Sequence, residues 1–504
     1  MNTPAADAST TRSCLDRRRA GVLLHPTSFP GGVGNGDLGL DAHRFVDFLA
    51  DAGFTVWQTL PLGPTNASRS PYQTLSVHAG NEMMISLDRL VADGWLEPFD
   101  EEDLDETDWL EVKDFRERML RSAYEGFQTH ADDHWRGRFE QFIVRHQSWL
   151  EDYCLFRCIK AEHADSAWWD WPAALRDRQP AAMAAAERRL AEPLAQRRFE
   201  QFLFFQQWCE VKHHANERGV LLYGDMPIFV AEDSAETWAQ RRYFALDHKG
   251  RPELVAGVPP DYFSATGQRW GNPHYRWDVM QADGFSWWLE RLRGQLELCD
   301  ILRIDHFRGF ESYWAIPADS ETAINGTWIP APGDALFETL HDTFDPLPLV
   351  AEDLGIITPE VEAIRRKWGL PGMKILHFAF GSGPENPYLP HNHSRNYVVY
   401  TGTHDNDTTC GWFAGLSPEE QAEVCEYLDA DRNDMPWPLI RAALASTANL
   451  AVVPLQDLLN LGADHRMNTP GTTEHNWRWR FTWSKVPDAL ADRVSKLNRL
   501  YGRV

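Results

Sequence analysis

The sequence is poor in cysteine, in basic residues and in long apolar runs. Its 504 residues include 7 cysteines, an odd number, and contain no Cys-x-x-Cys pair, which argues against a disulfide framework or a structural zinc site. Lysine and arginine number 49 against 74 aspartates and glutamates, for a net charge of −25. Nucleic acids and anionic membranes both attract a cationic face, so this balance argues against either as a main partner.

No apolar run approaches the roughly 20 residues that a transmembrane helix requires. Residues 1–17 are polar, and residues 17–19 are three consecutive arginines, so this region lacks the apolar centre of a signal peptide. We expect residues 1–17 to form a disordered tail, and we expect the protein to be cytoplasmic.

The residues that are present are typical of a globular chain, with 43% hydrophobic and 24% charged. Tryptophan is abundant, with 22 residues, and some of these lie in polar loops rich in glycine and proline. Aromatic faces in such loops suit ligands, and sugars present apolar C–H faces that pack against them. This composition is a soft indication of carbohydrate binding.

Short apolar or β-branched runs, each bounded by turn residues, predict eight buried parallel strands. Segments of helical periodicity separate most of them, and eight alternating β/α units favour an α/β fold of the TIM (β/α)8 barrel type over an open sheet. No Gly-x-Gly-x-x-Gly opens a helix after the first strand, so a dinucleotide site is not indicated. The predicted strands are residues 20–25, 55–62, 219–230, 299–307, 347–355, 372–380, 397–405 and 451–459, and the clearest helices are 41–52, 285–298, 359–368, 417–428 and 489–500.

The chain is longer than the roughly 250 residues of a simple barrel, so insertions are expected in a barrel spanning residues 18–504. Residues 87–205, between the second and third predicted strands, are rich in helix formers and predict a large helical insertion. Residues 231–273 and 310–337 are irregular and rich in aromatic residues, glycine and proline. Loops this long in a compact protein usually form lids or binding walls, so we expect them around the C-terminal face of the barrel.

Polar residues stand at the same end of six of the eight predicted strands. A parallel barrel gathers the C-terminal ends of its strands at one face, where active sites lie. One polar cap is common, but six at the same end are hard to obtain by chance. We therefore expect an acidic site there, suited to acid/base and covalent chemistry at a sugar carbon. The residues are His25, Asp225, Arg303 with Asp305, Glu352 with Asp353, His404 with Asp405, and Gln456 with Asp457.

The neighbours of these carboxylates predict different roles for them. Arg303 and Asp305 are two positions apart and share a strand face, and an adjacent guanidinium favours the charged carboxylate that a nucleophile must be. Asp405 follows His404, from where it would hold sugar hydroxyls and stabilise positive charge in an oxocarbenium-like transition state.

Glu352 is the predicted proton donor of the set. Its neighbour Asp353 is an anion, which would raise the pKa of Glu352 and keep it protonated. The alternative is that these carboxylates only pair with arginines or cap helices. A catalytic metal is a further alternative, but the first strand offers only His25 without a second histidine, and His306 should point away from Asp305.

An ordered series of motifs resembles the α-amylase clan and, more narrowly, the 4-α-glucanotransferases called amylomaltases or disproportionating enzymes, glycoside hydrolase family 77. The resemblance runs from about residue 21 to the C-terminus. A short Arg-x-Asp is weak alone, whereas the ordered series is strong. The motifs are residues 70–73, 224–228, 233–234, 267–273, 303–310, 352–355, 402–406, 468–471 and 476–479.

The resemblance implies a role for each matching residue. Asp305 matches the nucleophile that forms a β-glucosyl-enzyme, Glu352 the general acid/base, and Asp405 the residue that grips the sugar hydroxyls. It also implies a set of substrate-binding residues, with Trp270 in a loop over the acceptor side. This set comprises Tyr72, Asp225, Trp270, Asn272, Pro273, Arg303, His404 and Gln456.

The implied activity is transfer of α-1,4-glucan segments from a donor maltooligosaccharide to the 4-OH of an acceptor glucan or glucose, by retaining double displacement. The expected partners are maltooligosaccharides and α-1,4-glucans derived from glycogen or starch, without a metal or an organic cofactor. One alternative is an α-1,4-glucan hydrolase of the same clan, which gives the intermediate to water. Another is a non-catalytic glucan-binding protein, which would require loss of a catalytic carboxylate.

Overall fold

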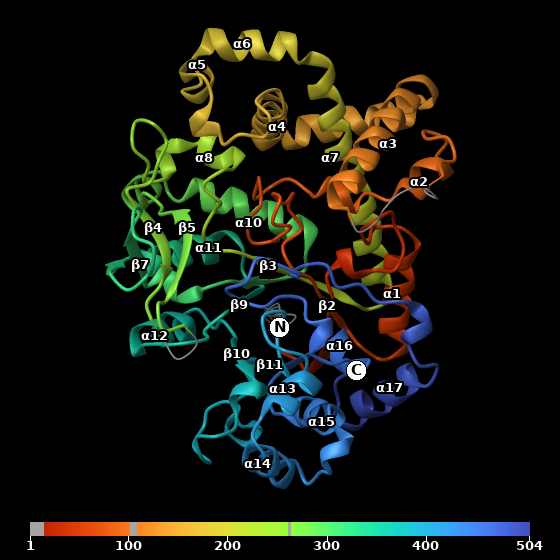
Figure 1. Cartoon of the computed structure of the whole chain (residues 1–504), viewed down its shortest axis with the longest axis vertical. Helices are drawn as coiled ribbons and strands as arrows, with labels where there is room; N and C mark the ends of the chain where they lie inside the picture. Colours follow the sequence, from red (N-terminus) through yellow and green to blue (C-terminus); the bar gives the residue numbers. More distant parts are fainter. Residues whose placement is uncertain (1–14, 101–107, 261–263) are drawn as a thin grey trace, which may run out of the picture.

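The computed structural model describes residues 15–100, 108–260 and 264–504 (Figure 1), so most of the tail predicted for residues 1–17 lies outside the described ranges. Within them, eight parallel strands form one sheet. The sheet closes on itself, because the N–H of Ala351 donates to the carbonyl of Pro371 at 2.8 Å. The predicted barrel is confirmed, with the strand order β10 (Gly372–Ile375), β11 (Tyr397–Tyr400), β12 (Leu450–Pro454), β1 (Arg19–Leu23), β2 (Val56–Gln58), β3 (Leu221–Met226), β6 (Ile301–Ile304) and β9 (Leu349–Ala351).

The strands are buried almost throughout, which explains why their sequences are apolar on both faces. One set of side chains fills the inside of the barrel, as in a packed core rather than a pore. Tyr223 and Tyr400 meet there, with 3.3 Å between their hydroxyl oxygens. The interior set includes Leu23, Val56, Tyr223, Ile301, Val350, Met373, Ile375, Val398, Tyr400, Leu450 and Val452.

Helices cover the outside of the barrel and pack on the second face of the strands. The five helices predicted most clearly are all present, and α14 begins with the predicted capping box between Ser417 and Glu420. These elements follow the strands in the order α1 (Leu40–Asp51), α8 (Ala235–Ala239), α9 (Trp277–Ala282), α10 (Ser286–Leu298), α11 (Gly333–Thr343), α12 (Pro359–Lys367), α13 (Thr409–Gly415), α14 (Pro418–Leu428), α15 (Trp437–Ala445), α16 (Leu455–Leu458) and α17 (Leu490–Leu500).

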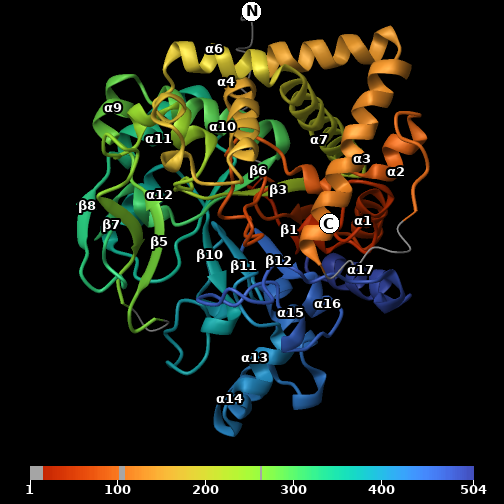
Figure 2. The ribbon, with the colours of Figure 1, turned by 45° about the horizontal axis from the view of Figure 1, so that its top comes forward.

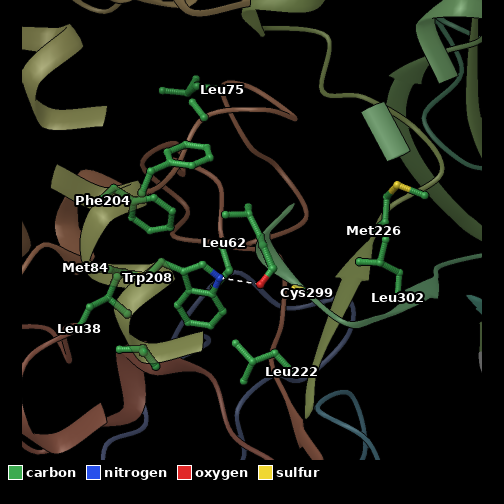
Figure 3. Packing of buried hydrophobic residues seen from close by; sticks show 14 of the residues in the cluster. Leu38, Leu62, Leu75, Met84, Phe204, Trp208, Leu222, Met226, Cys299 and Leu302 are labelled. Atoms are coloured by element: carbon green, nitrogen blue, oxygen red, sulfur yellow. Dashed lines mark hydrogen bonds between the residues drawn. The ribbon is translucent and has the colours of Figure 1, made fainter. Parts of the chain in front are cut away.

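The segment between β2 and β3 is helical, as predicted, and rises above the barrel in Figures 1 and 2. Its last helix, α7, runs beyond residue 205 and is also the helix that leads into β3. Trp208 of α7 donates to the carbonyl of Leu298 at 2.8 Å within a packed apolar cluster (Figure 3). Residues 101–107 of this segment lie outside the described ranges. Its helices are α2 (Leu87–Ala92), α3 (Trp109–His130), α4 (Asp133–Glu162), α5 (Ala173–Arg176), α6 (Pro180–Arg189) and α7 (Ala191–Glu217).

The two segments predicted to be irregular, 231–273 and 310–337, contribute strands to one antiparallel sheet beside the barrel. The two segments meet where Val255 pairs with Ile316. Sequence periodicity missed these strands, because each is only four to six residues long, and the pairing of β4 with β7 joins two distant segments. The order is β5 (Gln268–Pro273), β4 (Leu254–Val258), β7 (Ser312–Pro317) and β8 (Thr327–Pro330), and residues 261–263 fall outside the described ranges.

The division of the chain into a barrel of residues 18–504 with separate insertions stays a prediction. Across the described residues, no helix combines the length and the apolar character needed to span a membrane.

Candidate active site

The strand register brings Asp305 and Glu352 together. Ile304 at the end of β6 pairs with Ala351 at the end of β9, so Asp305 and Glu352 are the next residues on two adjacent strands. Both therefore stand at the C-terminal face of the barrel, where barrel enzymes place their catalytic groups.

Arg303 lies beneath Asp305 and bridges the carboxylates of Asp305 and Asp225. Its Nη2 is 2.9 Å from Oδ1 of Asp305, the contact that strand alternation predicts, and its Nη1 is 2.8 Å from both carboxylate oxygens of Asp225. The hydroxyl of Tyr72 donates to Oδ2 of Asp225 at 2.7 Å. Burial raises the pKa of Asp225 above its usual value, although the guanidinium of Arg303 opposes this. The side chain of Asp305 is 28% exposed, whereas that of Arg303 is only 6% exposed.

Glu352 is held by two backbone amides. Its Oε2 accepts from the N–H of His306 at 2.7 Å, and its Oε1 accepts from the N–H of Leu354 at 2.9 Å. Burial raises the pKa of Glu352 to about 7; Arg303 opposes the shift and the negative charge of Asp305 adds to it. A carboxyl group with that pKa holds its proton near neutral pH, which suits a general acid/base.

Asp353 does not act on Glu352 in the way that the sequence suggested. Its Oδ2 lies 3.2 Å from Nε of Arg365, and its Oδ1 accepts from the N–H of Met373 at 2.6 Å. The charge of Asp353 is compensated there, and the anion that raises the pKa of Glu352 is Asp305. Adjacent residues at a strand end face opposite sides, so the neighbour in sequence is not the neighbour in space.

Asp405 faces the same site from the turn that follows β11. Its Oδ2 lies 3.3 Å from Nε2 of His404, and its Oδ1 accepts from Nδ2 of Asn468 at 2.6 Å. Desolvation raises the pKa of Asp405, but the charge and hydrogen bond of His404 and the hydrogen bond of Asn468 outweigh it and lower the pKa to about 2. Tyr72 stacks on the ring of His404, with 5.2 Å between centroids and 18° between planes. Asp405 is therefore a charged carboxylate whose side chain is still 47% exposed.

A cleft of about 420 Å³ opens above these residues, and both Asp305 and Asp405 lie in its wall. Trp270 of β5 also lines it and contacts the ring of His306 edge-on, at 4.9 Å and 87°. Of the predicted binding residues, Tyr72, Trp270 and Asn272 line this cleft. A volume of this size is typical of small-molecule sites.

Five of the predicted binding residues are absent from the cleft wall. Asp225, Arg303 and His404 lie behind it and contact Tyr72, Asp305 and Asp405, respectively. Pro273 is buried in β5, paired with Val255 of β4. Gln456 lines a separate small cavity behind His404, together with His25. Burial and the neighbouring His404 lower the pKa of His25 to about 3, so this histidine is neutral there.

Several cleft residues were not assigned a role from the sequence, most of them in the stretch after β12. Strand-end reasoning could not find the three residues in the stretch after β12, because they lie far beyond the end of that strand, although two of the recognised motifs, 468–471 and 476–479, contain them. Their signal was asparagine and tryptophan in a loop rich in glycine and proline. They are Phe229, Gln268, Asn468, Asn476 and Trp477. In the described part of the chain, no group of three or more His, Cys, Asp or Glu side chains is arranged to hold a metal ion.

Comparisons with known proteins give a consistent result. The sequence profile of the 4-alpha-glucanotransferase family matches residues 24–485. A 4-alpha-glucanotransferase of Synechocystis is 48% identical over 501 residues, covering 97% of this chain and 99% of that protein. A 4-alpha-glucanotransferase of Thermus thermophilus is 49% identical over 472 residues, covering 92% of this chain and 94% of that protein.

The structure of amylomaltase from Streptococcus agalactiae, solved in complex with acarbose, superimposes with a TM-score of 0.92 at 35% sequence identity. The match covers 97% of this chain and all of that one. The family profile, the near-complete relatives and the barrel with its acidic strand ends agree. The chain belongs to the 4-alpha-glucanotransferase family.

Proposed function

We propose that this 4-alpha-glucanotransferase moves α-1,4-glucan segments between maltooligosaccharides, or glucans derived from glycogen or starch, through a covalent β-glycosyl-enzyme on Asp305. One observation carries the mechanism: a charged carboxylate paired with Arg303 stands next to Glu352, whose pKa is about 7. A nucleophile and a proton donor on adjacent strand ends are the two carboxyl groups of a retaining mechanism.

In the first step, Asp305 attacks the anomeric carbon of the donor sugar. Arg303 occupies Oδ1 of Asp305, and no other hydrogen bond to this carboxylate is found among the described residues, so Oδ2 is the oxygen that forms the new bond. The glycosidic bond breaks, its electron pair goes to the leaving oxygen, and Glu352 gives its proton to that oxygen. The products are the glycosyl ester of Asp305, the departing saccharide and ionised Glu352.

In the second step, the 4-OH of an acceptor sugar attacks the same carbon from the side that the leaving group vacated. Glu352 takes the hydroxyl proton, the new glycosidic bond forms, and Asp305 leaves as a carboxylate. Two inversions give net retention. The enzyme returns to its starting protonation state without any net change.

Asp405 and its neighbours act on the sugar that is bound to Asp305. The carboxylate is charged and half exposed to the cleft, so it can accept hydrogen bonds from sugar hydroxyls and stabilise positive charge at the ring. His404 and Asn468 hold its two oxygens. Tyr72, stacked on His404, gives the floor of the cleft a flat apolar face that suits a pyranose ring.

Transfer rather than hydrolysis requires that water be kept from the intermediate. The sheet β5-β4-β7-β8 stands at the side of the cleft, and Trp270 contributes its ring to the wall. An aromatic wall that closes over a bound acceptor would exclude water and orient the attacking hydroxyl.

Incubation of the purified protein with maltotriose tests the proposal. Transfer yields glucose together with products longer than maltotriose, which chromatography resolves. A hydrolase of the same clan yields only glucose and maltose. A non-catalytic binding protein yields no products, and the presence of Asp305, Glu352 and Asp405 at one face argues against it.

The remaining expectations from composition stay predictions. The net charge of −25 supports the absence of a nucleic-acid or anionic-membrane partner. A cytoplasmic location is likewise a prediction, which fractionation of the producing cells would test.

A further inference from the structure

A second cavity, of about 710 Å³, adjoins the active site and has no role in the mechanism above. It lies between the loop after β9, the loop after β10 and helix α13, all on the C-terminal side of the barrel. Aromatic and aliphatic side chains dominate its lining, with His377, Ser382 and Glu420 as polar members. We call it the Trp412 cavity, and its apolar members are Ile356, Phe378, Phe380, Tyr388, Trp412 and Leu416.

Trp412 gives this cavity a flat face. The ring of His377 stacks on one side of the indole, with 4.6 Å between centroids and 10° between planes, and the hydroxyl of Thr409 holds His377 at 3.0 Å. The indole is therefore held in place by His377, and both rings line the cavity. The ring of Phe380 is also close to Trp412, with 5.9 Å between the ring centroids and 39° between the ring planes. Ile356, another lining residue, is 63% exposed. A surface of this kind, left open to water, is characteristic of a binding site rather than of a core.

The cavity lies close to the acid/base. Leu354 donates its N–H to Oε1 of Glu352, and the next two residues, Gly355 and Ile356, line the cavity. Tyr388 lines it from the other side, and its pKa is raised to about 12 by burial and by the charges of Asp353 and Glu352. A ligand that occupied this cavity would thus extend from the position of Glu352.

The direction of the substrate chain follows from the role of Glu352. In the proposed mechanism this group gives its proton to the leaving oxygen and takes one from the attacking hydroxyl, so the departing and incoming chains lie on its side. The sugar bound to Asp305 extends the other way, into the part of the cleft that Tyr72 and Asp405 line, whereas Trp270 stands over the acceptor side of the same cleft.

We propose that the Trp412 cavity binds the acceptor α-1,4-glucan, several units beyond the bond being formed. This inference rests on the proposed function. The C–H face of a glucose unit packs on the aromatic lining formed by Trp412 and Phe380, and Ser382 and Glu420 are polar lining residues that can bind its hydroxyls. Binding energy from these remote units favours long acceptors over glucose.

The test compares acceptors of two lengths with one donor. In Trp412→Ala and in Phe380→Ala, the ratio of kcat/KM for maltoheptaose to kcat/KM for glucose should fall on the order of tenfold, the usual effect of removing one aromatic anchor. The matched control is Trp169→Ala, which removes a partly exposed tryptophan that packs on Trp168 and Arg251 in the helical segment, away from the cavity. The control should keep the wild-type ratio. An equal loss for both acceptors, or no loss, would overturn the proposal.

A binding measurement separates this inference from the proposed function. In an Asp305→Asn background, which does not turn over, calorimetry with maltoheptaose should show an affinity about tenfold weaker when Trp412→Ala is added, and no change when Trp169→Ala is added. Equal affinity in all three proteins would reject a glucan occupant of the cavity. If the wild type did not lengthen maltotriose, the proposed transfer activity would be rejected instead. The calorimetric result would still decide whether the Trp412 cavity binds glucan.

Discussion

The backbone N–H of His306 donates to Oε2 of Glu352 at 2.7 Å, which ties the strand end that carries Asp305 to the strand end that carries Glu352. His306 has a φ of 51°, in the left-handed region that residues with a side chain seldom adopt. Its side chain is buried against Trp270 and Phe229. The hydrogen bond from His306, whose backbone has this left-handed conformation, holds the acid/base beside the nucleophile.

Replacement of Asp305 by asparagine should abolish transfer while leaving the fold intact. Asparagine keeps the shape and can still accept a hydrogen bond from Arg303, but it is a very weak nucleophile. We expect kcat on maltotriose to fall by roughly four orders of magnitude or more, as when a covalent nucleophile is removed. Circular dichroism should give a spectrum like that of the wild type. Activity near the wild-type level would refute the assignment of the nucleophile.

Replacement of Glu352 by glutamine should block reactions whose leaving group needs a proton. With maltotriose, kcat should fall by about 10²–10⁴-fold, the usual contribution of general acid–base catalysis. With α-glucosyl fluoride, whose leaving group departs without protonation, formation of the glycosyl-enzyme should remain fast in a single-turnover measurement. A deficit of equal size on both donors would contradict the role of Glu352.

The dependence of kcat/KM on pH should reveal the ionisation of Glu352. Its pKa is raised to about 7, so in the folded enzyme the proton donor is present below that pH and lost above it. We expect kcat/KM for maltotriose to fall about tenfold per pH unit on the alkaline side of 7. Asp405, with a pKa of about 2, stays charged throughout and contributes nothing to this limb.

Asp353→Asn distinguishes the two possible sources of the shift in Glu352. Because Arg365 compensates the charge of Asp353, this variant should keep the alkaline limb where the wild type has it. If the alkaline limb of the pH profile moved by a full pH unit toward acid, Asp353 would be the cause of the raised pKa of Glu352. Thermal unfolding of the same preparation controls for loss of the buried ion pair with Arg365.

Arg303→Gln should destabilise the protein as well as inactivate it. The change leaves Asp225 buried without a counter-charge, and breaking a buried pair by removing one partner typically costs about 3–5 kcal/mol. We expect a lower Tm in differential scanning calorimetry. Adding Asp225→Asn should recover part of the lost stability but not the activity, since Asp305 would still lack Arg303. An unchanged Tm in the single variant would contradict the bridging role.

Features of the strands and helices that depend on neighbouring residues were predicted correctly from the sequence. Short apolar runs predict all eight barrel strands, because a strand buried on both faces must be apolar along its length. Alternation along β6 correctly predicts that Arg303 contacts Asp305. The capping box at Ser417 is equally local and equally correct. These features depend only on residues close together in the chain.

The inferences that failed needed contacts between distant segments. Asp353 adjoins Glu352 in sequence, yet it faces Arg365, while Asp305 supplies the anion. The sheet β5-β4-β7-β8 could not be predicted as one unit, because its central pairing joins β4 and β7, which belong to different segments. Asn468 reaches Asp405 from a loop that follows no strand of the site.

The sequence by itself determined the barrel, the six polar strand ends and the chemical types of the reacting groups, since these depend on hydrophobic pattern and residue identity. The tertiary structure alone decided which of those groups are neighbours. Register places Asp305 beside Glu352, Arg303 joins Asp305 to Asp225, and burial raises the pKa of Glu352. Electrostatic interactions depend on distance in space and on burial, and neither quantity is written in the order of the residues.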